Sequence, residues 1–126
     1  MKFHHIGIAV ENIEQALCSL KQQYPVIETT DIIWDESQNA SLCMATLEDG
    51  FKIELVSGET VKGWIKRGQS LYHVCYQVNN LDIELEKRCQ YAGNVLVSSP
   101  KEAELFHKKR VAFIKTELGL VELLER

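Results

Sequence analysis

The sequence predicts an α+β fold made of two similar halves, each reading strand, helix and then several strands. An internal repeat carries this prediction, because residues 5–17 align without a gap with residues 73–85, an offset of 68 residues. The same offset places residues 51–56 on 119–124 and pairs Glu54 with Glu122. Short β-rich runs alternate with only a few helical stripes, so strands dominate each half.

The chain length and composition are those of one globular domain. It has 126 residues, of which 45% are hydrophobic and 25% are charged, and this is enough to build one core. We expect a single domain over 1–126, with a first module at 1–58, a linker at 59–70 and a second module at 71–126.

Charge and hydropathy exclude several classes of partner. The net charge of −4 has the wrong sign for binding a phosphate backbone, so we expect no nucleic acid. No apolar run approaches the roughly 20 residues that cross a bilayer, and the first residues do not resemble a signal peptide. We therefore expect no membrane association and a cytoplasmic location. The four cysteines include no Cys-x-x-Cys pair and lie in apolar segments, which predicts reduced, buried thiols.

The first half begins with a strand at 3–10. Asn12 is a good N-cap for a helix whose apolar stripe runs from Ile13 to Leu20, and Pro25 forbids its continuation. Further strands are expected at 26–34, 40–47 and 51–57, with the turn at Asp49-Gly50 joining the last two.

The second half repeats this order after a short amphipathic helix around Val61 to Ile65. A strand at 71–78 precedes a helix that Asn80 caps, and its stripe runs from Leu81 to Ala92 before the left-handed Gly93. The remaining strands are expected at 94–98, 110–115 and 119–125.

Strand alternation places four polar side chains on one kind of face. His5 lies on the side of its strand opposite to the apolar residues, and His73 does the same in the second half. Glu54 and Glu122 likewise point away from the flanking apolar residues that would pack on the helices. The repeat therefore directs two imidazoles and two carboxylates to one side.

Two imidazoles and two carboxylates form a ligand set for a divalent ion. This set suits Ni, Co, Zn, Mn or Fe better than a structural zinc, whose sites are usually closed and rich in cysteine. A buried glutamate costs several kcal/mol unless a cation pairs with it, so the repetition of the pattern favours coordination.

The chain resembles the vicinal oxygen chelate superfamily, which includes glyoxalase I, methylmalonyl-CoA epimerase, extradiol dioxygenases and fosfomycin-resistance proteins. The motifs that carry the resemblance are His-Ile-Gly-Ile-Ala-Val at 5–10, Lys-Ile-Glu-Leu at 52–55, Tyr-His-Val-Cys-Tyr-Gln-Val at 72–78 and Val-Glu-Leu-Leu-Glu at 121–125. The resemblance implies two βαβββ modules that form an open, cupped mixed sheet around a metal site. It also implies a homodimer and one divalent ion, with His5, Glu54, His73 and Glu122 as ligands.

Within the superfamily the chain is most similar to methylmalonyl-CoA epimerases. That similarity implies an acyl-CoA thioester substrate, removal of its α proton through an enolate, and Glu122 as the base. The second acid of those epimerases is not matched, because Ser37 or Gln38 stands at its position. A glyoxalase I-type lyase acting on a hemithioacetal is the alternative, followed by a dioxygenase. A non-catalytic module that binds small molecules also stays open.

A weaker set of residues is expected to contact substrate. Cys75 and Gln77 share the face of His73, and Gln38 stands at the position of the missing acid. The basic run of Lys108, Lys109 and Arg110 could meet the phosphates of an acyl-CoA through charge-assisted hydrogen bonds.

Overall fold

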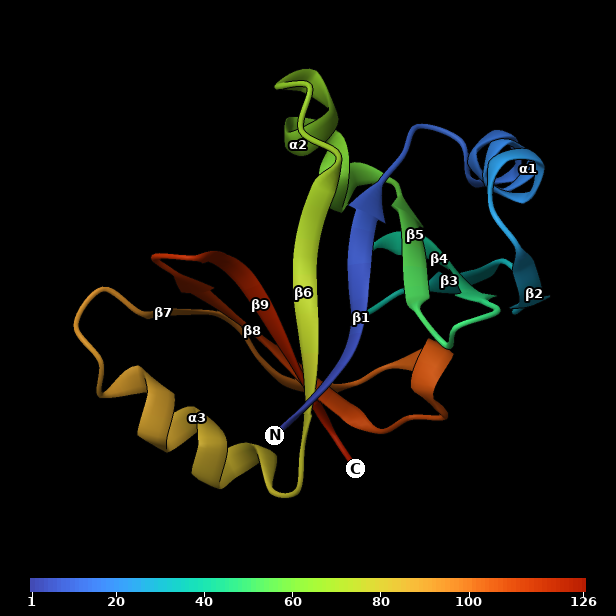
Figure 1. Ribbon diagram of the computed structural model, residues 1–126. Coiled ribbons are helices and arrows are strands. Elements are labelled where there is room, and N and C mark those ends of the chain that lie inside the picture. The colour runs from blue at the N-terminus through green and yellow to red at the C-terminus, as the bar shows by residue number, and fades with distance from the viewer.

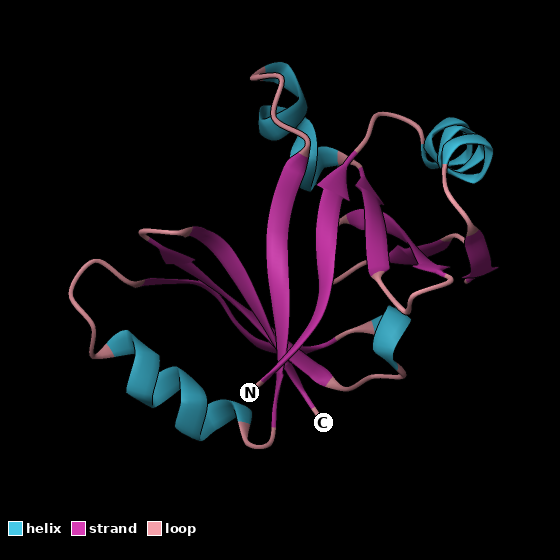
Figure 2. Ribbon diagram, in the orientation of Figure 1, coloured by secondary structure: helices cyan, strands magenta, loops and turns pink.

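The computed structural model describes all 126 residues and has the predicted α+β architecture. One mixed sheet of nine strands curves around a central pair, β1 and β6, and its two halves curl back on either side of that pair (Figure 1). Figure 2 shows the helices lying around this sheet instead of within it. The open, cupped sheet predicted from the sequence is therefore confirmed.

The first half carries five strands and one long helix. Asn12 caps the helix by accepting a hydrogen bond from the Gln15 backbone N–H, and the helix ends just before Pro25 as predicted. The elements of this half are β1 (Lys2–Ala9), α1 (Ile13–Gln23), β2 (Val26–Thr29), β3 (Ile33–Asp35), β4 (Ala40–Leu47) and β5 (Lys52–Ser57).

The second half follows two short helical turns and repeats the order with four strands. Asn80 caps its helix by accepting from the Ile83 backbone N–H, which mirrors the cap of the first half. The elements are the 3₁₀ turn η1 (Glu59–Val61), α2 (Lys62–Lys66), β6 (Leu71–Val78), α3 (Leu81–Cys89), β7 (Val95–Glu102), the 3₁₀ turn η2 (Glu104–Phe106), β8 (Arg110–Thr116) and β9 (Gly119–Glu125).

The repeat is visible in the strand pairing. The sheet order is β2-β4-β5-β1-β6-β9-β8-β7, with β3 also paired to β4, and the two halves meet where β1 and β6 run antiparallel. In the first half Gly7 pairs with Glu54 across β1 and β5, and in the second half Cys75 pairs with Glu122 across β6 and β9. Equivalent registers in the two halves thus bring the repeated residues to equivalent places.

The two helices cover the outer face of the sheet, and the inner face carries Glu54 and Glu122 beside a separate buried apolar cluster of Cys75, Ala103, Val111, Phe113 and Leu124. Ile13 of α1 packs on Cys43 and Leu55. Leu81 and Leu85 of α3 pack with Ile114 and Leu123. This burial accounts for the strand parity, because the apolar residues of β5 and β9 face the helices while Glu54 and Glu122 face inward.

A polar clamp joins the two halves across the inner face. The buried Asp35 carboxylate accepts hydrogen bonds from the Ser37 N–H and hydroxyl, from the Gln38 N–H and side chain, and from the Glu104 N–H. Lys101 adds a bond from its ammonium group to the Ser37 carbonyl, at 2.7 Å. The turn after β3 is thereby fastened to η2, which lies against the inner face.

Three local predictions are wrong. The strand expected at 26–34 is split, because Thr29 pairs with Ala45 while Ile33 pairs with Leu42, so this side carries one residue more than β4 between the two pairs. The helix α3 ends at Cys89, before Ala92, although Gly93 does have a positive φ of 91°. The strand expected at 94–98 continues to Glu102 as an edge strand, a position that tolerates Pro100.

The cysteine prediction is half right. All four thiols are free, and Cys43 and Cys75 are buried, but Cys18 and Cys89 are exposed. Both exposed residues lie on the solvent side of α1 and α3, where an apolar stripe identifies a helix without showing which of its residues stay covered.

No helix has the length and hydropathy that a membrane crossing requires.

Candidate metal centre

Four side chains from the two halves converge on the inner face of the sheet. His5 and His73, from the paired strands β1 and β6, place their Nε2 atoms 3.2 Å apart. Glu122 Oε1 lies 3.2 Å from each of these nitrogens. Glu54 Oε1 lies 3.6 Å from the nitrogen of His5 and 3.3 Å from that of His73. We refer to these four residues as the His₂Glu₂ cluster.

The spacing of the four donor atoms fits a single ion. Donors held about 2.1 Å from one ion are separated by about 3.0–3.4 Å in octahedral or tetrahedral arrangements. Four of the five observed separations, at 3.2–3.3 Å, lie within that range, and the fifth, at 3.6 Å, lies just above it. The donor set also fits, because imidazole nitrogen and carboxylate oxygen bind Zn, Ni, Co, Mn and Fe.

Burial makes the cluster costly unless a cation joins it. Each of its residues is at most 2% exposed, and His73 Nδ1 has no hydrogen-bond partner. Buried polar groups are rarely left without partners. The arrangement therefore has the features of a site built for an ion instead of a hydrogen-bonded network that is complete in itself.

The cluster electrostatics follow from the proximity of opposite charges. Burial lowers the pKa of His73, but Glu122 and Glu54 outweigh burial and raise it to about 9. Burial also lowers the pKa of His5, and the same two carboxylates raise it above the ordinary value. Burial raises the pKa of both glutamates, but the two imidazoles hold each below its ordinary range. Both carboxylates are therefore ionised at neutral pH.

Gly7 makes room for one of the two imidazoles. A Cβ atom at this position would lie 2.2 Å from His73 Cε1 and 2.7 Å from its Nε2. The φ angle of Gly7 is not positive, so the backbone does not require glycine here. Glycine is required because the His73 ring occupies the space that any side chain would fill. Tyr72 and Phe113 pack edge-on against the same ring.

His5 is held differently, by a hydrogen bond. Its Nδ1 lies 2.8 Å from Nδ1 of His4, which reaches the same side of the sheet through an irregularity in the pairing between Phe3 and His5. Phe106 of η2 stacks on the His5 ring with the two centroids 5.6 Å apart. Burial, followed by the charge of His5, lowers the pKa of His4 to about 4, so His4 is neutral.

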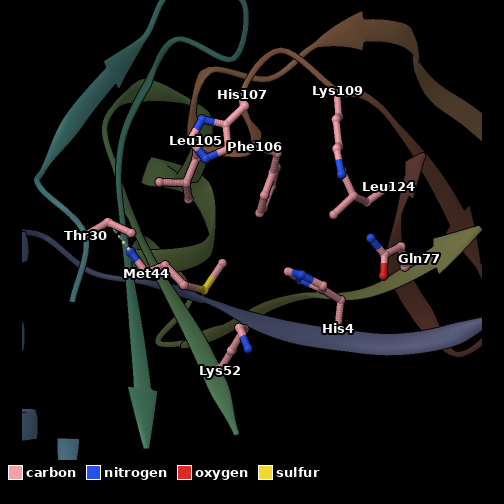
Figure 3. Close-up of a pocket in the computed structure, with 10 residues that line it drawn as sticks. All are labelled: His4, Thr30, Met44, Lys52, Gln77, Leu105, Phe106, His107, Lys109 and Leu124. Atoms are coloured by element: carbon pink, nitrogen blue, oxygen red, sulfur yellow. Dashed lines mark hydrogen bonds between the residues drawn. The ribbon is translucent and has the colours of Figure 1, made fainter. Parts of the chain in front are cut away.

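A cavity of about 220 Å³ adjoins the cluster on the side of His4 (Figure 3). His4 and Phe106, which both pack against His5, line it, and Figure 3 shows Lys52 at the bottom of the view and Lys109 at the top. No acidic residue lines this cavity. The complete lining is His4, Thr30, Met44, Lys52, Gln77, Leu105, Phe106, His107, Lys109 and Leu124.

The weaker set of expected substrate residues is dispersed. Gln77 and Lys109 line the cavity beside His4, whereas Gln38 lines a second cavity with Tyr72 and Phe113. Cys75 is buried on the cluster side, and burial together with the charge of Glu122 raises the pKa of its thiol.

The basic run does not act as a unit. The guanidinium of Arg110 is paired with Asp82 and Glu125. Lys108 is exposed and does not line the cavity beside His4, which its neighbour Lys109 does line. These pairings leave Lys109 as the one cation of the run that faces the cavity beside the cluster.

Sequence reasoning missed several residues of this region. Lys52 shares the strand parity of Glu54, so alternation alone could have placed it on the inner face. Gly7 stands opposite His73, but only the strand register reveals this. Asp35 and Phe106 carry no local signal, because their roles depend on contacts with residues far away in the sequence.

Comparisons with known proteins agree with the fold. The family profile of the glyoxalase/bleomycin resistance protein/dioxygenase superfamily matches residues 4–113. No curated protein sequence matches the chain.

Three solved structures are among those that superpose well. Methylmalonyl-CoA epimerase from Mycobacterium tuberculosis has a TM-score of 0.80 and 20% identity, covering 98% of this chain and 87% of that chain. A variant of Streptomyces coelicolor methylmalonyl-CoA epimerase in complex with 2-nitronate-propionyl-CoA has a TM-score of 0.76 and 16% identity, with coverages of 99% and 96%. Glyoxalase I from Zea mays has a TM-score of 0.69 and 18% identity, with coverages of 100% and 43%. At these identities the likeness establishes the fold alone.

Proposed function

Because the chain belongs to the glyoxalase/bleomycin resistance protein/dioxygenase superfamily, we propose that it is a metal-dependent enzyme that removes a proton α to a carbonyl, most like methylmalonyl-CoA epimerase. The observation that carries the proposal is the His₂Glu₂ cluster, with its four buried donor atoms facing one another. His5, Glu54, His73 and Glu122 are the proposed ligands.

The cluster residues would hold one divalent ion, of which Ni, Co, Zn, Mn and Fe are the candidates. Such an ion, when bound, polarises a substrate carbonyl and stabilises negative charge on its oxygen. The chain contributes fixed positions for the donors, because each comes from a central strand of the sheet and not from a loop.

Glu122 is the proposed base. Against the effect of burial, the two imidazoles lower its pKa and keep the carboxylate ionised at neutral pH, with its Oε1 lying 3.2 Å from Nε2 of both His5 and His73. Glu122 also lies among the other proposed ligands, so it would be close to the α carbon of a substrate whose carbonyl binds at this site. Inversion of the centre needs a proton on the opposite face of the enolate, and this proton would come from solvent because the region has no second buried acid.

A second candidate function is a glyoxalase I-type lyase, which moves a proton between adjacent carbons of a hemithioacetal. The observation that favours it is the lack of a free buried acid at the end of β3 and in the turn that follows, where an epimerase would carry its second acid. Asp35 is fully engaged in hydrogen bonds there, and the Gln38 amide donates to it. The buried carboxylates are those of Asp35, Glu54 and Glu122, so the region has no additional buried acid to serve as a second base.

The lining of the cavity beside His4 indicates the charge and polarity of the substrate group that it would accept. Its only charged lining residues are the cations Lys52 and Lys109, with Gln77 as a further donor and Met44, Leu105 and Leu124 as apolar surface. Such a lining suits a ligand with an anionic group on an apolar frame. We therefore propose that this cavity receives the anionic acyl part of the substrate, such as the free carboxylate of a substituted acyl-CoA thioester.

The test is exchange of the α proton with solvent deuterium. Metal-loaded protein in D₂O is incubated with an acyl-CoA thioester or with a glutathione hemithioacetal, and deuterium incorporation is followed by NMR. Exchange should require metal, and Glu122→Gln should slow it by about 10²–10⁴-fold, the usual contribution of a positioned base. Glu117→Gln is the matched control, because Glu117 is exposed in the turn that precedes β9.

The pattern of exchange separates the candidates. Exchange with the thioester supports the epimerase, and isomerisation of the hemithioacetal alone supports the lyase. A protein that binds metal and leaves both compounds unchanged would contradict the proposed chemistry and favour a non-catalytic binding module.

A further inference from the structure

The hydrogen bond between His4 and His5 bears on where the proton of the His5 imidazole lies. His5 faces His73, Glu54 and Glu122 with its Nε2 atom, so Nε2 is the atom that would bind the ion. A neutral imidazole that gives its Nε2 lone pair to a metal carries its single proton on Nδ1. In His5 this Nδ1–H points at Nδ1 of His4, 2.8 Å away.

His4 can only be the acceptor in this arrangement. Its Nδ1 must then be unprotonated, and its own proton lies on Nε2. Phe106 packs edge-on against the His4 ring, with centroids 5.6 Å apart, and stacks on the His5 ring at the same distance, so one side chain restrains both imidazoles. His4 is half-buried and lines the cavity of Figure 3, which places it between the cluster and solvent.

The other ligand histidine has no such partner. His73 Nδ1 is buried without a hydrogen bond, and its ring is held by the space above Gly7 and by Tyr72 and Phe113. The His4 interaction is therefore a feature of one ligand only and not a consequence of the repeat. At the position equivalent to His4 the second half has Tyr72, which packs on His73 as an aromatic ring without a ring nitrogen.

We propose that His4 is a positioning residue for His5: by accepting the His5 Nδ1–H it fixes the tautomer and the ring plane that direct Nε2 to the ion. Partners of metal-bound histidines are usually carboxylates, backbone carbonyls or water, and an imidazole in this role is neutral. A neutral partner leaves the negative charge of the site to Glu54 and Glu122. A ligand that enters the cavity touches His4 and thereby acts on the metal ligand behind it.

The inference rests on the proposed metal site, and its test is metal binding instead of turnover. Co²⁺ is titrated into chelator-treated wild type, His4→Ala and His4→Asn, and the visible absorption of the bound ion is recorded. His4→Ala should weaken Co²⁺ binding by about 10–100-fold and change the absorption spectrum, the usual effect of removing such a partner. His4→Asn should restore most of the affinity, because its Oδ1 can accept the same hydrogen bond.

His107→Ala is the matched control, since His107 lines the same cavity and makes no contact with the cluster. If His4→Ala does not fold, His4→Phe keeps the ring that packs on Phe106 and lacks only the acceptor nitrogen. In the Zn²⁺-loaded wild type, ¹⁵N NMR should detect a proton on Nδ1 of His5 in a persistent hydrogen bond. This signal should disappear in His4→Phe and remain in His107→Ala.

Two results would overturn the inference. If wild type binds Co²⁺ and both His4→Ala and His4→Phe bind it equally well with an unchanged spectrum, His4 does not position His5, and the proposed metal site is unaffected. If wild type itself binds no Co²⁺, the inference and the proposed function both fail.

Discussion

The two halves of the molecule each supply one histidine and one glutamate to the His₂Glu₂ cluster, and they hold the two histidines in different ways. Gly7 and Cys75 are equivalent positions in the repeat, and each stands across the β1–β6 pair from the histidine of the other half. Gly7 leaves a slot that the His73 ring fills. Cys75 carries a side chain opposite His5, and there His4 holds the His5 ring by a hydrogen bond.

This difference shows how a duplicated scaffold can diverge without losing its centre. The backbone register fixes where the four donor atoms meet, and the register is the same in both halves. The imidazoles are oriented in two different ways. His73 is held by packing, and His5 is held by a hydrogen bond to His4. Substitutions at the two equivalent positions should therefore have unequal effects.

The largest effect is expected at the slot of His73. Gly7→Ala places a Cβ within 2.2 Å of the ring, so the ring must leave the cluster, and metal affinity should fall by about 100-fold or more. Calorimetric titration with Zn²⁺ measures the loss. Gly63→Ala is the control, because Gly63 is exposed in α2 and an added Cβ meets only the flexible end of Arg67. If Gly7→Ala and wild type bind Zn²⁺ with equal affinity, the space above Gly7 is not needed to place the His73 ring in the cluster.

The next effect is a pH dependence of metal binding. The pKa of His73 is raised to about 9 in the metal-free protein, so below that pH the ion must displace a proton from this imidazole. Apparent Zn²⁺ affinity should therefore increase with pH, by about tenfold per pH unit for each proton released, and level off near pH 9. Titrations in buffers of different ionisation enthalpy count the protons. An affinity that is constant between pH 6 and pH 8 would show that no proton competes at His73.

A smaller effect is expected from the clamp between the halves. Asp35→Asn turns one acceptor oxygen into an NH₂ group facing donors that include the Glu104 N–H, and should lower the free energy of unfolding by about 1–3 kcal/mol. Urea unfolding of chelator-treated protein measures this change. Glu36→Gln, at the exposed neighbouring position, should leave the midpoint unchanged. If the two variants unfold alike, the clamp does not stabilise the fold.

The smallest effect is expected at Cys75. Cys75→Ala removes a buried thiol that stays protonated because burial and Glu122 raise its pKa, so it should cost about 1 kcal/mol of stability and change metal affinity by less than about threefold. Cobalt absorption provides the readout, since a thiolate ligand gives an intense charge-transfer band. If wild type shows this band and Cys75→Ala lacks it, the Cys75 thiolate is a metal ligand. The prediction that metal affinity depends strongly on Gly7 and only weakly on Cys75 would then be wrong.

The repeat made much of this structure predictable. Because β5 and β9 keep their apolar residues toward the helices, alternation directs Glu54 and Glu122 inward, and the same logic applies to His5 and His73. The caps at Asn12 and Asn80 marked the helix starts for a local reason, since each side chain bonds a backbone N–H three residues on.

Other features depend on contacts between distant residues and leave no local pattern. Asp35 reaches Glu104, and Phe106 stacks on His5, across large sequence separations. The break between β2 and β3 arises from one residue too many against β4, which the apolar pattern of 26–34 does not record. The exposure of Cys18 and Cys89 was missed for a similar reason, because an apolar stripe identifies a helix but does not show how deeply each of its residues is buried.

The measurement that tests the central claim most directly is the metal content of the purified protein after incubation with Zn²⁺ or Co²⁺ and removal of free ion. We predict about one ion per chain in wild type and a loss of that ion in His73→Ala, because the four donor atoms all lie within 4.8 Å of one another. An equal metal content in wild type and His73→Ala, or no metal in wild type, would contradict the proposal that His5, Glu54, His73 and Glu122 form a metal centre.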